Sequence, residues 1–156
     1  MNRRLLGPCA LALAALLCAA AAWDHLRARD DTALAHARAR DAALADGGDR
    51  IALLLGHDAE DPAASRRGWL AAATGPLREE LRRTPRPKRG PGARAVVTDA
   101  ALTALDTRAG TARLIATVRV DLTPGGSERK RLEAQLARTS DGWKVESLDA
   151  VPVGDA

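Results

Sequence analysis

Residues Thr139–Val151 read TSDGWKVESLDAV, and this stretch indicates how the chain completes its fold. An Asp-Gly pair between two alternating runs is a strong β-hairpin signal, because a type I′ turn needs positive φ at both central residues. With Asp141 and Gly142 in those positions, Ser140 would face Trp143 across the hairpin. The sequence therefore predicts two antiparallel strands joined at this turn.

The hairpin also predicts which side chains share a face. Because side chains alternate between the two faces of a strand, Trp143 and Val145 should lie on the same face as the apolar residues before the turn, Leu132, Ala134 and Leu136. Trp143 is one of three tryptophans in a chain with no Phe or Tyr. We therefore expect it to fill the core beneath the hairpin. The alternation slips between Val145 and Leu148, which predicts a bulge there or the strand's end near Val151.

Two more strands are expected upstream of the hairpin. Residues 111–123 (TARLIATVRVDLT) alternate polar side chains with apolar ones, which predicts a half-buried strand; the apolar positions are Leu114, Ala116, Val118, Val120 and Leu122. Residues 93–105 (ARAVVTDAALTAL) are predicted to form another strand. The sequence does not decide which face of this strand carries Asp99. Residues 84–92 (TPRPKRGPG) form a loop by composition.

Helices are predicted before the strands. Residues 24–55 contain no proline and carry apolar side chains near helical spacing, so we expect a helix over 24–46 that Gly47-Gly48 interrupts, with a continuation over 50–56. Another helical region covers residues 65–83 and restarts at Gly75-Pro76. The predicted class is α+β, with two to three helices packed on a curled antiparallel sheet of about four strands.

The first segment sets the expected location. Arg3 and Arg4 precede an uncharged run from Leu5 to Trp23, whose length is close to the ~20 residues that cross a bilayer as a helix. We expect residues 1–23 to be a single-pass membrane anchor with a cytoplasmic N-terminus, followed by a juxtamembrane helix (24–46), an extracytoplasmic domain (47–152) and a tail (153–156). A cleaved signal peptide is the alternative for the first segment.

Composition argues against several classes of function. The formal net charge is +4 and the pI about 9.8, but basic residues are not interleaved with aromatic ones, so no nucleic-acid partner is expected. Both cysteines, Cys9 and Cys18, lie in the first segment, and the three histidines are far apart. We expect no metal site and no cofactor, because neither metal-ligand spacing nor a nucleotide-binding glycine motif occurs.

Few residues are candidates for chemistry. His57 and Asp58 are adjacent at the end of an apolar helix and are the weak candidates for general acid–base work, which needs a buried group. Their simpler interpretation is that they follow the helix in solvent. Trp69, Val118 and Trp143 either belong to the core or line a pocket inside the curled sheet. We expect a protein that is not an enzyme.

The order of segments resembles a known family. An anchor, an Ala/Arg-rich helix (ALAHARARDAALA), the helical ends IALLLGHD and GPLREEL, the strands ARAVVTDAAL and ARLIATVRVDL, and the closing DGWKVESLDAV follow one another. This looks like the Mce-associated membrane proteins of actinobacteria, whose outer domain resembles the cone-shaped nuclear transport factor 2/SnoaL-like fold.

The resemblance implies an accessory role beside an Mce-type lipid or sterol importer of the cell envelope, with the membrane and transporter subunits as partners and homo-oligomerisation as a possibility. Two alternatives stay open. One is an assembly factor of a conjugation or type IV secretion channel, which shares the layout of one anchor and one cone-shaped domain. The other is a SnoaL-like small-molecule enzyme or lipid-binding cone.

Overall fold

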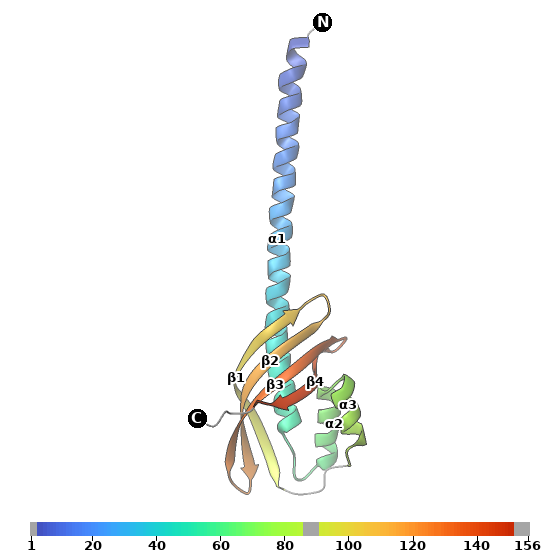
Figure 1. Cartoon of the computed structure of the whole chain (residues 1–156), viewed down its shortest axis with the longest axis vertical. Helices are drawn as coiled ribbons and strands as arrows, with labels where there is room; N and C mark the ends of the chain where they lie inside the picture. Colours follow the sequence, from blue (N-terminus) through green and yellow to red (C-terminus); the bar gives the residue numbers. More distant parts are fainter. Residues whose placement is uncertain (1–2, 86–90, 152–156) are drawn as a thin grey trace. The chain divides into compact units, whose positions relative to one another are not determined.

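The computed structural model describes residues 3–85 and 91–151, which form three helices followed by four strands (Figure 1). These are α1 (Arg3–Leu55), α2 (Pro62–Ala72), α3 (Gly75–Arg83), β1 (Gly92–Asp106), β2 (Thr111–Thr123), β3 (Ser127–Thr139) and β4 (Gly142–Ala150). The strands form one antiparallel sheet in the order β1-β2-β3-β4. The predicted α+β class and the four-stranded sheet are confirmed. Most of the expected 84–92 loop and the 153–156 tail lie outside the described residues.

The chain divides into two compact units, Met1–Arg38 and Ala39–Ala156. The first unit is the N-terminal part of α1. Among the residues that the structure describes, no helix is both long and apolar enough to cross a membrane. The anchor expected at residues 1–23 therefore stays a prediction.

In the second unit the sheet curls around the last turns of α1, while α2 and α3 lie together beside β4 (Figure 1). The core lies between α1 and the inner face of the sheet, where every second residue is buried from Ala112 to Val120 in β2 and from Leu132 to Leu136 in β3. The predicted alternation of β2 is confirmed for Leu114, Ala116, Val118 and Val120, and Leu122 is half-buried. Ile51 supplies the largest fully buried side chain of α1.

The predicted interruption at Gly47-Gly48 is wrong, because α1 continues to Leu55. A Cβ on Gly47 would lie 2.8 Å from Leu136 Cδ1 and 3.2 Å from Leu114 Cδ1. The missing side chain thus lets the helix approach the sheet closely. A glycine inside a helix costs only about 1 kcal/mol relative to alanine, so packing against the sheet outweighs the poor propensity.

The predicted position of the last turn is also wrong. Ser140 and Asp141 form the loop, Thr139 pairs with Gly142, and of the two residues predicted at the centre of the turn only Gly142 has positive φ (93°). The hydroxyl of Thr139 explains this choice, because it accepts a hydrogen bond from Asp141 N (3.2 Å) and donates one to Gly142 O (2.9 Å). A glycine of positive φ directly after a turn is typical of hairpins with a G1 bulge.

The face assignment of the hairpin is nevertheless confirmed. Trp143 lies opposite Arg138 instead of Ser140, and a shift by two residues returns each side chain to its own face, whereas a shift by one would not. Trp143 and Val145 are buried together with Leu132, Ala134 and Leu136. The register shifts again between Gln135 and Leu136, which is the slip predicted after Val145.

A hydrogen bond also joins the hairpin to α1. Asp46 Oδ2 accepts a hydrogen bond from the backbone N of Trp143 at 2.9 Å. The same carboxylate would lie 2.6 Å from a Cβ on Gly142. Glycine at position 142 thus permits both the left-handed backbone and the approach of Asp46, which fixes β4 over the end of α1.

Candidate functional site

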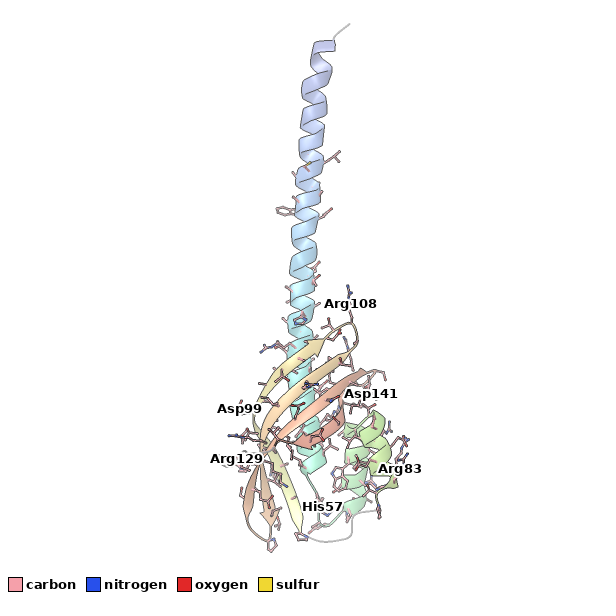
Figure 2. All side chains as sticks on the ribbon, in the orientation of Figure 1. His57, Arg83, Asp99, Arg108, Arg129 and Asp141 are labelled. Atoms are coloured by element: carbon pink, nitrogen blue, oxygen red, sulfur yellow. The ribbon has the colours of Figure 1, made fainter. Side chains whose placement is uncertain are left out.

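His57 and Asp58 lie directly after α1, and the structure gives each a structural task. The backbone N of His57 donates to Ala93 O, and Ala93 N donates to His57 O, both at 2.8 Å, so this residue forms a bridge to the start of β1 (Figure 2). The ring centroid of His57 lies 5.9 Å from that of Trp69, and Nδ1 is buried without a hydrogen-bond partner.

Asp58 is exposed and organises the turn before α2. Its Oδ1 accepts hydrogen bonds from Glu60 N (2.8 Å) and Asp61 N (3.4 Å), while its own N donates to Ser65 Oγ (2.8 Å). Asp61 then caps α2 by accepting from Ala64 N at 2.8 Å. No hydrogen bond links the side chains of His57 and Asp58, so in this structure they do not form the oriented pair that general acid–base catalysis uses.

The three predicted core or pocket residues are divided between two places. Val118 (0 % exposed) and Trp143 (2 % exposed) belong to the core on the inner face of the sheet. Trp69 is half-buried on α2, where its Nε1 donates to Gly56 O at 2.8 Å and fastens α2 to the end of α1. Val118 and Trp143 therefore fill the inside of the curl, where the pocket hypothesis needs open space.

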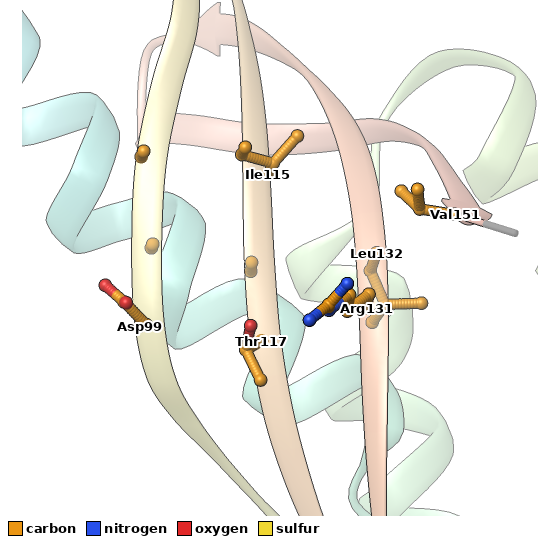
Figure 3. Close-up of a pocket in the computed structure, with 9 residues that line it drawn as sticks. Asp99, Ile115, Thr117, Arg131, Leu132 and Val151 are labelled. Atoms are coloured by element: carbon orange, nitrogen blue, oxygen red, sulfur yellow. The ribbon is translucent and has the colours of Figure 1, made fainter. Parts of the chain in front are cut away.

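The outer face of the sheet carries a hollow of about 420 Å³ that sequence reasoning missed (Figure 3). Its centre is a cross-strand row in which Asp99 of β1 pairs with Thr117 of β2, and Thr117 pairs with Arg131 of β3. Ala101 and Ile115 form the neighbouring row, and Val151 lies at the rim. The side chains of Ala101 and Thr117 are small, so they leave a depression in this part of the outer face.

Some charged side chains on the outer face form ion pairs within the chain, and others do not. Arg113 pairs with Glu133 and Arg119 pairs with Asp121, each at 3.3 Å. Within the described part of the chain, neither Asp99 nor Arg131 has an ion-pair partner; the other ion pairs are Arg67–Asp61, Arg82–Glu79, Lys130–Glu128 and Lys144–Asp141. Asp99 and Arg131 thus leave one negative and one positive charge on opposite sides of Thr117.

Two carboxylates in turns have shifted pKa values. Backbone hydrogen bonds from Ala109 and Arg108 lower the pKa of Asp106, and a side-chain hydrogen bond from Lys144 lowers the pKa of Asp141. Both carboxylates are exposed at the ends of hairpins, so they stabilise turns in their charged form. Among the described residues, no group of three His, Cys, Asp or Glu side chains could hold a metal ion.

A comparison with solved structures identifies the fold. CagV, a VirB8 homolog of the T4SS from Helicobacter pylori strain 26695, superposes with a TM-score of 0.58 over 72 % of this chain and 98 % of that chain, at 10 % sequence identity. The domain therefore shares its fold with this VirB8 homolog.

Two further structures are similar to parts of this chain. They are TraE in complex with 2-(2-furyl)isonicotinic acid (13 % identity, 67 % of this chain and 90 % of that one, TM-score 0.46) and an Ntf2-like protein involved in plasmid conjugation (13 %, 73 % and 49 %, TM-score 0.43). No family model matches the chain, and the search of curated proteins gives no match. None of these comparisons supports the Mce-associated assignment, which therefore remains an expectation.

Proposed function

We propose that this protein is a non-enzymatic assembly subunit of a conjugation or type IV secretion channel, held at the cell membrane by residues 1–23 with its domain outside the cytoplasm. The observation that carries the proposal is the fold shared with CagV, a VirB8 homolog of a T4SS, over 98 % of that chain. The anchor expected from the sequence adds the layout of one membrane segment and one outer domain.

The other two readings have less support. The Mce-type importer rests on the resemblance of short motifs alone. The enzyme or lipid-binding cone needs a cavity lined by Trp69, Val118 and Trp143, yet Val118 and Trp143 are packed in the core. His57 forms a bridge to β1 and Asp58 holds a turn, and both line an open hollow of about 420 Å³ between the end of α1, α2 and the start of β1 rather than a cavity inside the curl.

Deletion of the gene in the source organism tests the proposal. We expect transfer of DNA or protein through the channel to fall to the level of a strain that lacks a known channel subunit, because an assembly subunit has no substitute. Plasmid-borne parent chain should restore transfer, whereas a copy carrying only residues 1–46 should not, since the domain would make the subunit contacts. Normal transfer in the deletion strain, combined with impaired lipid uptake, would favour the importer instead.

A further inference from the structure

We propose that the free edge of β1 binds an extended segment of a partner protein as a fifth strand, over Ala95 and Val97, with one apolar side chain of that segment in the hollow beside His57. This inference rests on the edge of the sheet and does not depend on the proposed channel. β1 is the first strand in the order β1-β2-β3-β4, so one of its sides pairs with β2 and the other is an edge (Figure 1). A free edge is a template on which another strand can pair.

The chain itself uses the first position of this edge. Both backbone groups of Ala93 hydrogen-bond to His57 at 2.8 Å, in an antiparallel bridge. Because the direction of the backbone groups alternates along a strand, those of Ala95 and Val97 point to the same side as those of Ala93. Among the described residues, Ala93 alone in β1 has a backbone hydrogen bond to a segment other than β2. The groups of Ala95 and Val97 are therefore available to an added strand.

This part of the edge lacks the features that usually protect an edge strand. Natural edges are protected by bulges, prolines, lysines or charged side chains that point inward. Register shifts follow Val97 and Leu102, so the regular edge ends at Val97. Before that point, residues 93–97 (ARAVV) contain no proline or lysine, and their one charged side chain, Arg94, is exposed. The segment thus remains competent to pair over a short length.

A hollow of about 420 Å³ lies beside this segment and favours an apolar side chain opposite Ala95. Residues that face each other in a pair of strands project to the same face, and Ala95 packs on the core side of β1. A partner residue opposite Ala95 therefore projects toward the hollow. The walls that α1 and α2 contribute are mostly small or apolar; they include Ala52, Leu53, Ala64 and Gly68.

Charge indicates the neighbouring residue of the partner segment. Arg94 lies opposite Asp121, whose carboxylate pairs with Arg119 at 3.3 Å, and no ion pair of Arg94 occurs within the described residues. Because side chains alternate along a strand, the partner residue next to the apolar one lies beside Arg94. An acidic side chain there would neutralise the guanidinium. The partner segment is therefore expected to carry an apolar residue followed by Asp or Glu.

The edge fits such a segment better than it fits a second copy of β1. Antiparallel pairing of two β1 strands about Val97 would place Ala101 of one copy opposite Ala93 of the other. His57 already occupies that position. The occupant must therefore end or turn away before Ala93, as a chain terminus or a short extended loop of a partner does.

Peptide selection and amide exchange test the proposal. The probe is a phage-displayed library of random linear peptides, selected on the full chain in detergent micelles, and the selected peptides are then synthesised. We expect them to share an apolar residue followed by Asp or Glu. In the free chain the amides of Ala95 and Val97 should exchange faster than that of Val96, which pairs with β2. Added peptide should slow the exchange of both amides.

Two substitutions should each weaken peptide binding about tenfold, as expected for the loss of one hydrogen bond or of one apolar contact. Ala95→Pro removes the outward N–H, and proline is tolerated on an edge strand where the N–H faces solvent. Gly68→Leu fills the hollow, since a Cβ there meets nothing within 4 Å. Gly48→Leu is the matched control, because it also enters open space but does not line the hollow.

A second pair of variants tests the charge. Arg94→Glu should weaken binding of the acidic peptides, whereas Arg108→Glu should not, because Figure 2 shows Arg108 at the opposite end of the domain from His57. The proposal would be overturned if no peptide were selected, or if Ala95→Pro and Gly68→Leu left peptide binding unchanged. Self-association of the parent chain that Ala95→Pro abolishes would also overturn it, because the occupant would then be a second copy.

Discussion

Replacement of Trp143 by alanine should lower the free energy of unfolding by about 3–5 kcal/mol, the usual cost of removing a buried Trp or Phe side chain. Trp143 is 2 % exposed and packs in a core otherwise made of Ala, Val, Leu and Ile. These small residues bury little area each, at roughly 25 cal/mol per Å². The loss of one indole therefore removes a large share of the core.

Urea denaturation of the full chain, followed by circular dichroism, measures this effect. Trp143→Phe should cost distinctly less than Trp143→Ala, because most of the ring volume is kept. Leu53→Ala is the control, since Leu53 lies on α1 in the same unit but is exposed. If Trp143→Ala and Leu53→Ala lowered the free energy of unfolding equally, the assignment of Trp143 to the core would be refuted.

The neighbouring glycines of α1 should respond in opposite directions. Gly47→Ala should lower the free energy of unfolding by about 1–3 kcal/mol, as overpacking of a core does, because the new Cβ would lie 2.8 Å from Leu136 Cδ1. Leu136 is itself buried, so its methyl group cannot move freely. Gly48→Ala meets nothing within 4 Å and should raise the free energy by about 0.5–1 kcal/mol through helix propensity.

The two alanine variants control for each other, because they introduce the same group one residue apart. Tryptophan fluorescence in a urea titration reports the transition, since Trp69 and Trp143 both lie in the second unit. Equal stabilisation by both substitutions would show that the helix does not approach the sheet at Gly47.

The sequence predicts those features of the fold that depend on periodicity. The alternation in residues 111–123 sets which face of β2 is buried, and the parity of the last hairpin places Trp143 in the core. Both follow from side-chain direction along a strand. The observed turn lies one residue earlier than predicted, which shifts each cross-strand partner by two residues and leaves the faces unchanged. The hydrogen bonds of the Thr139 hydroxyl favour a turn at Ser140-Asp141 instead of Asp141-Gly142. No sequence pattern around Asp141-Gly142 predicts those hydrogen bonds.

Contacts between distant segments are not predictable in this way. From the sequence alone, Gly47 indicates a break in the helix. The structure shows that it lies against Leu136, which is distant in the sequence, and this contact explains a glycine inside the helix. The row of Asp99, Thr117 and Arg131 depends on register shifts in β1 after Val97 and Leu102. At these shifts the hydroxyls of Thr98 and Thr103 donate to carbonyls of β2. No spacing of residues in β1 alone encodes those shifts.

The central claim is that this chain works as a subunit of a secretion or conjugation channel, and affinity purification from native membranes tests it most directly. The full-length protein would be tagged at its C-terminus, extracted with a mild detergent and analysed for co-purifying proteins, with Trp143→Ala as the variant whose domain is destabilised. We expect channel subunits with the parent chain and markedly fewer with the variant. Recovery of lipid-importer subunits, or of the protein alone, would contradict the claim.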